Sequence, residues 1–226
     1  MNGDWSVRED ALLQASWLRY YATLPAQLEL FAADGSWLAE VAPQNCRRFV
    51  TVDPAGTSAD RAREMRGRAP CATAIQVWDQ VLERPFPALI LREAWRGLVG
   101  FDQLCQRLRD MNRHWQPDQI WIENEKLGQA AVDVLRRELP IATVPTGGKD
   151  KIARAGWLIS RLERGEVFLP REPYPWRMEW EAELLGWTGH PAETCDQVDA
   201  AAYAAIVAEK SSIRTVRLLG EGVVVK

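Results

Sequence analysis

Residues 49–56 read FVTVDPAG, a β-prone run that ends at an acid. Its first four residues are aromatic or β-branched, which favours an extended strand. Asp53 follows at the end of the run, and Pro54 and Gly56 then stop the strand. The stretch therefore predicts a core strand with a carboxylate at its carboxyl-terminal end.

A regular succession of elements follows this first strand. Further strands are expected at 73–81, 88–94, 119–122, 141–144 and 167–169, and helices at 101–115, 127–138, 151–164, 179–185 and 196–210. Three strands in succession favour a meander, and the later alternation of strand and helix favours parallel additions. The order predicts an α/β domain with a mixed central sheet flanked by helices, and periodicity alone permits several folds of that class.

The N-terminal 46 residues differ in pattern from the rest of the chain. An amphipathic helix is expected at about 8–21 and a short strand at 27–31. We interpret residues 1–46 as a short lead-in or linker segment that packs on the core. Residues 47–226 then form one domain, since a chain of 226 residues suits a single core with a short appendage.

The composition is that of an ordinary globular protein, with 47% hydrophobic and 26% charged residues. No apolar run reaches the roughly 18–20 residues that a membrane span needs, and no signal peptide is visible, so we expect a cytoplasmic protein. The four cysteines are scattered, which favours reduced thiols over a zinc site or a disulfide framework. A net charge of -3 argues against bulk coating of DNA but permits local contact with phosphate.

Three acidic positions lie where predicted core elements meet loops. Asp53 ends the first core strand, Glu123 ends the fourth, and Asp196 opens the last helix with Asp199 one turn further on. Phosphodiester hydrolysis needs divalent cations, and Mg²⁺ and Mn²⁺ prefer carboxylate oxygens. On pattern alone a structural interpretation is stronger, because Asp196 suits a helix N-cap and Asp199 complements the helix dipole.

Four segments in this order resemble the nuclease domain of phage terminase large subunits. They are residues 52–60 (VDPAGTSAD), 122–128 (IENEKLG), 148–155 (GKDKIARA) with 165–167 (GEV), and 195–200 (CDQVDA). Residues 3–5 (GDW), followed by a helix bearing Trp and Tyr, also resemble the segment that joins motor and nuclease in such proteins. The similarity spans nearly the whole chain. It implies an RNase H-like fold and a metal-dependent endonuclease that cuts double-stranded, concatemeric viral DNA during genome packaging.

The resemblance also implies the residues that hold two Mg²⁺ or Mn²⁺ ions. Asp53 is expected to bridge both ions, while Glu123 and Asp196 each complete one, and Asp199 is a supporting ligand. Asp60 matches a further acid near the first motif that could touch the second ion, and a solvated loop residue is the alternative.

The last motif departs from the pattern of the family. The family usually has a His-Asp-Asp triplet before the last helix, whereas this chain has Thr194-Cys195-Asp196. The His and the first Asp are therefore missing. Asp196 matches the second acid and is preferred, but either Asp196 or Asp199 could complete the site.

Basic residues near these motifs are candidates for contact with DNA. Residues 147–149 (GGK) lack the full Walker pattern, so ATP binding is not expected. The resemblance instead places Lys149, with Lys151 beside it, near the phosphate of the scissile strand, and solvent exposure is the alternative. The stretch 61–68 follows the first acidic motif. One interpretation is a salt-sensitive contact with the DNA backbone, and a loop without a role is the alternative. The candidate residues for this contact are Arg61, Arg63 and Arg66.

The resemblance further implies partners and leaves alternatives. The partners would be double-stranded DNA, a fused ATPase motor domain, the portal and the small terminase subunit, in the host cytoplasm during phage assembly. One alternative is a nuclease of the same fold similar to Holliday-junction resolvases or transposases. Another is a non-catalytic docking module, which the missing His and Asp before Asp196 keep open. A metabolic α/β enzyme is less favoured, since no dinucleotide glycine motif or nucleophile elbow is present.

Overall fold

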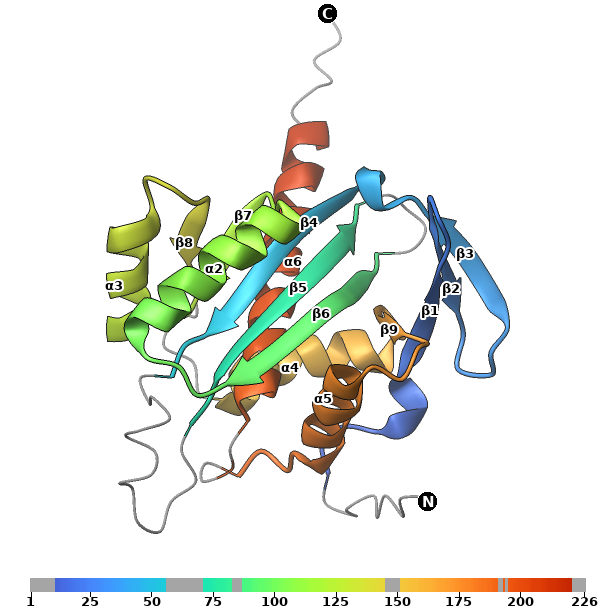
Figure 1. Cartoon of the computed structure of the whole chain (residues 1–226). Helices are drawn as coiled ribbons and strands as arrows, with labels where there is room; N and C mark the ends of the chain where they lie inside the picture. Colours follow the sequence, from blue (N-terminus) through green and yellow to red (C-terminus); the bar gives the residue numbers. More distant parts are fainter. Residues whose placement is uncertain are drawn as a thin grey trace, which may run out of the picture.

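The computed structural model describes residues 11–55, 71–82, 87–144, 151–190, 193 and 195–220, the last eleven of them by backbone alone. The described residues form one mixed sheet of nine strands, in the order β3-β2-β1-β9-β6-β5-β4-β7-β8 (Figure 1). The strands are β1 (Arg19–Thr23), β2 (Leu28–Phe31), β3 (Trp37–Val41), β4 (Cys46–Asp53), β5 (Thr73–Val81), β6 (Leu89–Gly97), β7 (Gln119–Ile122), β8 (Ile141–Thr143) and β9 (Val167–Pro170). The helices are η1 (Ala15–Trp17), η2 (Pro43–Asn45), α2 (Phe101–Trp115), α3 (Lys126–Leu135), α4 (Lys151–Glu163), α5 (Pro175–Gly186) and α6 (Asp196–Gly220).

The centre of the sheet has the expected mixture of directions. The strands β4, β5 and β6 form an antiparallel meander. The strand β7 then pairs with β4 in parallel, with Val52 opposite Ile122, and β8 pairs with β7 in the same way. The predicted α/β fold with a mixed central sheet flanked by helices is therefore confirmed.

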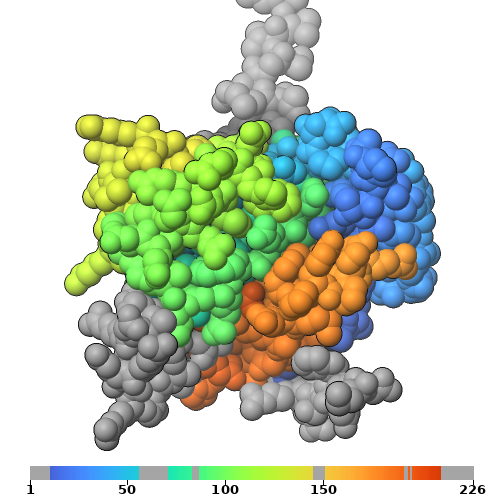
Figure 2. Space-filling model, viewed as in Figure 1, coloured from blue at the N-terminus to red at the C-terminus, as the bar shows by residue number. Residues whose placement is uncertain are grey.

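Helices cover both faces of this centre. Val50 and Val52 of β4 pack with α2 and α3, whereas Phe49, which points to the opposite face, packs with α4, α5 and α6. Figure 1 shows α2 in front of the sheet and α6 behind it. In the space-filling view, α2 and α3 lie on one side and α5 with β1–β3 on the other (Figure 2). Because it lies in the middle, β5 is buried from Thr73 through Gln80.

Residues 19–41 extend the sheet beyond β9. The strand β1 pairs with β9 in parallel, with Tyr20 opposite Leu169, and β2 and β3 follow as antiparallel neighbours. The expected helix at 8–21 is wrong for its described part, where the turn η1 precedes β1. Pairing with the edge of β9 overrides the local helical pattern. The side chain of Tyr21 is buried there, and its hydroxyl donates to the Leu91 carbonyl at 3.1 Å.

Local signals set the ends of the helices. The buried positions of α2 include Leu104, Leu108 and Met111, at the spacing of one helical face. The helix ends at Trp115. The next residue, Gln116, has a left-handed backbone with φ 47°, and Pro117 follows it. The helix α5 starts at Pro175, four residues before the predicted start, because proline suits the first turn of a helix. Within the described part of the chain, no helix is long and apolar enough to cross a membrane.

Candidate active site

Asp53 and Glu123 lie side by side because two parallel strands end at the same edge. Asp53 is the last residue of β4, and Glu123 directly follows β7. The backbone N–H of Glu123 donates to the Val52 carbonyl at 3.1 Å, which ties the two strand ends together. Burial, and then the negative charges of Asp199, Glu123 and Asp196, raise the pKa of Asp53 well above its ordinary value. Asp53 is therefore within electrostatic reach of three other carboxylates.

The helix α6 brings the remaining acids to this edge. Two buried glutamines of β5 hold it on the sheet: Gln76 Nε2 donates to the Gln197 carbonyl at 2.8 Å, and Gln80 Nε2 donates to the Ala208 carbonyl at 3.2 Å. Side-chain donors from a strand thus add to the apolar packing that fixes the helix. This arrangement sets the first turn of α6 beside the end of β4.

A carboxylate from α5 satisfies the amino-terminal end of α6. Glu183 Oε1 accepts the backbone N–H of Gln197 at 2.7 Å and that of Val198 at 3.3 Å. Such N–H groups lack partners within their own helix, and a negative charge favours that helix end. Because Glu183 takes this role, the side chain of Asp196 is available for other contacts.

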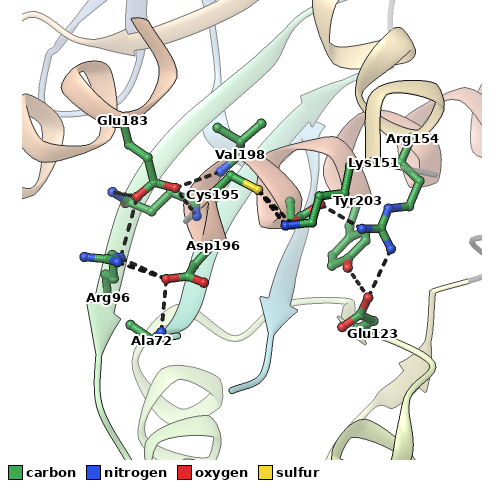
Figure 3. A network of polar contacts seen from close by, with 12 residues as sticks. Ala72, Arg96, Glu123, Lys151, Arg154, Glu183, Cys195, Asp196, Val198 and Tyr203 are labelled. Atoms are coloured by element: carbon green, nitrogen blue, oxygen red, sulfur yellow. Dashed lines mark hydrogen bonds and ion pairs between the residues drawn. The ribbon is translucent and has the colours of Figure 1, made fainter. Parts of the chain in front are cut away.

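Asp196 lies on the side of the site formed by Arg96 and Ala72 (Figure 3). Its Oδ2 accepts the Ala72 N–H at 3.0 Å and forms an ion pair with Arg96 Nη2 at 3.0 Å. Arg96 also lies 3.6 Å from Glu183 Oε2. These contacts connect the beginning of β5 and the end of β6 with α6.

Asp199 lies on the opposite side of the site, where it shares Arg154 with Glu123. Arg154 of α4 joins the two acids: Nη1 lies 3.2 Å from Glu123 Oε1, and Nη2 lies 3.0 Å from Asp199 Oδ1. The buried hydroxyl of Tyr203 donates to Glu123 Oε1 at 2.6 Å. Burial, and then Asp53 and Glu123, raise the pKa of Tyr203, so its hydroxyl remains a donor at neutral pH. Figure 3 shows Arg154 and Tyr203 converging on Glu123.

Cys195 contributes a neutral thiol beside Lys151 and Asp199. Its Sγ lies 3.1 Å from Lys151 Nζ and donates to Asp199 Oδ2 at 3.2 Å. Burial and the neighbouring Asp199 raise the pKa of Cys195 to about 12. The thiol is thus protonated at neutral pH, while Lys151 lies 3.6 Å from Asp199 Oδ2.

The structure divides the residues predicted from sequence into three groups. Asp53, Glu123 and Asp199 come together, and Lys151 lies beside Asp199. Asp196 is next to them but is engaged by Arg96 and Ala72. The remaining candidates lie outside the described residues: Asp60, Arg61, Arg63, Arg66 and Lys149.

Four further residues of the site were not predicted from sequence. Arg154 lies three residues after Lys151, so both face the same side of α4. Tyr203 lies four residues after Asp199 and therefore shares its face of α6. The helical spacing of Arg154 from Lys151, and of Tyr203 from Asp199, could therefore have identified both residues from the sequence. Arg96 and Glu183 had no comparable signal, because only the fold brings β6 and α5 to the start of α6.

The donor set suits a hard divalent cation. In their present positions, no group of three or more His, Cys, Asp or Glu side chains in the described residues could hold a metal ion. The carboxylates of Glu123 and Asp199 nevertheless meet around a positive charge, the guanidinium of Arg154. Carboxylate oxygens from separate elements are the ligands that Mg²⁺ and Mn²⁺ prefer. The chemistry of the residues therefore fits a divalent ion, with Arg154 now occupying the space between two acids.

Gly128 lets α3 begin directly against the Glu123 backbone. A Cβ at this buried position would overlap the Glu123 carbonyl oxygen. We expect Gly128→Ala to displace Glu123 and to lower the free energy of unfolding by roughly 1–3 kcal/mol, the usual cost of forcing an extra carbon into a packed site. Urea unfolding followed by circular dichroism measures this change.

Gly156→Ala is the matched control for that substitution. Gly156 lies within α4, and a Cβ there would have no neighbour within 4 Å. Because alanine is the better helix former, this variant should gain up to about 1 kcal/mol. Equal effects of the two substitutions would show that the overlap at Gly128 relaxes without cost.

Comparisons with known proteins agree with the architecture. No protein-family model matches the chain, and no curated protein sequence matches it. Among solved structures, the chain is similar to the large terminase nuclease of thermophilic phage G20c with bound magnesium, at 12% identity and a TM-score of 0.54, over 88% of this chain and 97% of that one. The same nuclease with bound zinc gives 14% identity and a TM-score of 0.51, over 85% and 92%. The P22 large terminase nuclease domain gives 12% identity and a TM-score of 0.50, over 75% and 84%. The chain therefore has the RNase H-like α/β fold of phage large terminase nuclease domains, as its sequence motifs predicted.

Proposed function

We propose that the protein is a divalent-metal-dependent endonuclease that hydrolyses phosphodiester bonds of double-stranded DNA. The observation that supports this most directly is the meeting of Asp53, Glu123 and Asp199 at one edge of the sheet. The fold agrees, since solved structures similar to the chain are terminase nucleases, one of them with bound magnesium.

Asp53, Glu123 and Asp199 are the residues that we propose hold the cations. Two Mg²⁺ or Mn²⁺ ions would supply activation of water and neutralisation of the leaving oxygen. The contacts favour Asp199 over Asp196 as the third acid, because Asp199 shares Arg154 with Glu123. Asp196, whose charge also acts on Asp53, is the candidate ligand for the second cation. Tyr203 orients Glu123 through its hydroxyl.

The packaging of viral DNA is the biological setting that we propose. Similarity to nuclease domains of large terminases supports a chain that works with an ATPase motor, a portal and a small terminase subunit. In that setting the substrate is concatemeric double-stranded DNA in the host cytoplasm. The candidate DNA-binding residues are Lys149, Lys151, Arg61, Arg63 and Arg66, and Asp60 is a candidate for the second ion.

Cleavage of supercoiled plasmid tests the proposed activity. The purified chain should nick and linearise plasmid with Mn²⁺ or Mg²⁺ and leave it intact in EDTA. A four-way junction of equal length serves as a second substrate. Strong preference for the junction would replace the proposal by a resolvase-like activity. Intact plasmid and intact junction at high Mn²⁺ would argue for a docking module without catalysis.

Tyr203→Phe is expected to weaken metal binding, so that cleavage needs a higher Mn²⁺ concentration, without abolishing activity. The variant keeps the ring but removes the hydrogen bond to Glu123 Oε1. Loss of a group that orients a metal ligand typically costs about 10–100-fold in metal affinity or activity. The Mn²⁺ concentration for half-maximal plasmid cleavage measures the effect. Tyr20→Phe is the control, since it removes a hydroxyl bonded to Glu181, outside this site. A similar shift in both variants would contradict the role of Tyr203.

A further inference from the structure

Arg154 is a positive charge held inside the carboxylate group of the proposed active site. Its side chain is 14% exposed, and those of Glu123 and Asp199 are 12% and 10% exposed. Each acid accepts one hydrogen bond, at 3.2 and 3.0 Å, from a different nitrogen of the guanidinium. The ring of Tyr203 lies beneath it, with the Arg154 Cζ 5.8 Å from the ring centroid. The guanidinium thus bridges two acids from two elements, as a divalent ion does.

The contacts of Arg154 differ from those of a structural arginine in the same protein. Arg48 holds the buried Asp79 through two nitrogens on one carboxylate, at 2.6 and 2.8 Å. Such paired contacts on a single acid are the strong form of this interaction. Arg154 makes single, longer contacts with each of two acids. It is therefore the more readily exchanged of the two arginines.

The carboxylates need a positive charge when no metal is bound. Four acids meet here, namely Asp53, Glu123, Asp196 and Asp199, and three of them are paired with basic side chains. Negative charges that lie close together and are shielded from water repel one another strongly. The cations within contact distance of these acids in the described residues are Arg96, Lys151 and Arg154. Of these, Arg154 alone contacts both Glu123 and Asp199.

We propose that Arg154 occupies the place of a divalent cation between Glu123 and Asp199, and that metal binding there requires Arg154 to leave these acids. This inference rests on the proposed function. Arg154 acts in this view as a positioning residue that sets the metal affinity of the site. It keeps the acids together in the metal-free protein and competes with the ion that replaces it.

Mn²⁺ titration calorimetry on the full chain tests the competition. The variant Arg154→Gln should bind Mn²⁺ with a Kd at least about tenfold lower than the wild type, the low end of what a unit charge a few ångströms away contributes. Arg154→Lys keeps the charge but cannot bridge two acids as the guanidinium does, so its Kd for Mn²⁺ should lie between those of the wild type and Arg154→Gln. Arg164→Gln is the control, because Arg164 pairs with Glu166 outside the carboxylate group and should leave the Kd unchanged.

Thermal unfolding gives a second measure that does not depend on cleavage. In EDTA, Arg154→Gln should melt below the wild type, since its acids lack their counter-ion. Mn²⁺ at one concentration above both Kd values should then raise its Tm by more than that of the wild type, because stabilisation by a ligand grows with the logarithm of its concentration divided by Kd. A structural role alone would lower the Tm without strengthening Mn²⁺ binding.

The outcomes separate this inference from the proposed function. Wild-type protein that binds Mn²⁺ and cuts plasmid, with an equal or higher Kd in Arg154→Gln, would overturn the competition and leave the nuclease standing. Absence of Mn²⁺ binding in the wild type and in both Arg154 variants would overturn both. Tighter binding in Arg154→Gln, with intermediate binding in Arg154→Lys, is the result that we expect.

Discussion

Replacing Asp53 by asparagine should abolish metal-dependent cleavage of plasmid. Asp53 lies at the end of β4 among three other acids, and we propose it as a ligand of the catalytic cations. A catalytic cation supplies several kcal/mol of transition-state stabilisation, and each 1.4 kcal/mol is about tenfold in rate, so the expected loss is at least about 10³-fold. Initial rates of nicking at saturating Mn²⁺ measure this loss. Asp133→Asn, on the exposed side of α3, is the control and should cut normally.

The same substitution should stabilise the metal-free protein. Burial and the neighbouring carboxylates raise the pKa of Asp53 above the ordinary 3.8, so the folded state prefers its protonated form. That preference contributes stability below about pH 4, and the contribution is lost as pH rises through the raised pKa. Asparagine has no charge to repel. In EDTA, the Tm of Asp53→Asn should therefore exceed that of the wild type by an amount that increases with pH across this window.

The two results together separate catalysis from folding. An inactive Asp53→Asn protein with a raised Tm has lost a ligand and not its fold. Undiminished cleavage by this variant would remove Asp53 from the proposed mechanism. A lowered Tm in EDTA would show that the acids are not repelling one another as the structure indicates.

Asp79→Asn should cause the largest loss of stability among the substitutions considered. Asp79 is fully buried on β5 and lies between Arg48 of β4 and Arg92 of β6, with contacts of 2.6 Å to each. The ring of Trp115 lies 5.2 Å from the Arg48 guanidinium and 5.6 Å from that of Arg92. Removing one charge of a buried network leaves the opposite charges without compensation. One carboxylate thus joins three strands and the end of α2.

Asp79→Asn should lower the free energy of unfolding by about 3 kcal/mol, which corresponds to a decrease in Tm of roughly 6–12 °C for a chain of this length. Calorimetry of the variant at neutral pH measures it. Glu138→Gln is the matched control, because it also removes a carboxylate that binds an arginine, but the pair with Arg109 is exposed and should leave the Tm near that of the wild type. A decrease in Asp79→Asn no larger than in the control would show that the two arginines find other partners.

The elements of the fold were predictable where the signal is local. The strand at 73–81, the helix at 101–115 and the strand at 119–122 have the predicted bounds, since side-chain periodicity and flanking proline or glycine act within a few residues. The strands β1 and β3 were not predicted, and a helix was expected where β1 begins. Both lie toward the edge of the sheet, where the partner strand decides the structure more than the sequence itself does.

The candidate site was predictable only in part for the same reason. Asp53 and Glu123 were identified because an acid at the end of a β-prone run is visible in the chain. Arg154 contacts Glu123 across 31 positions, and Tyr203 does so across 80. Helical spacing from Lys151 and Asp199 could mark these two positions, but no local pattern reports which side chains they contact at such separations. The preference between Asp196 and Asp199 likewise depends on which of them faces Arg154.

The sequence by itself therefore determined the order of strands and helices from β4 onward and the acids at their ends. These depend on short-range backbone preference and on the alternation of apolar side chains. The tertiary structure alone decided that Arg154 lies between two of those acids and that Glu183 caps α6. Electrostatic contacts form between groups that packing brings within a few ångströms, and packing is a property of the whole chain.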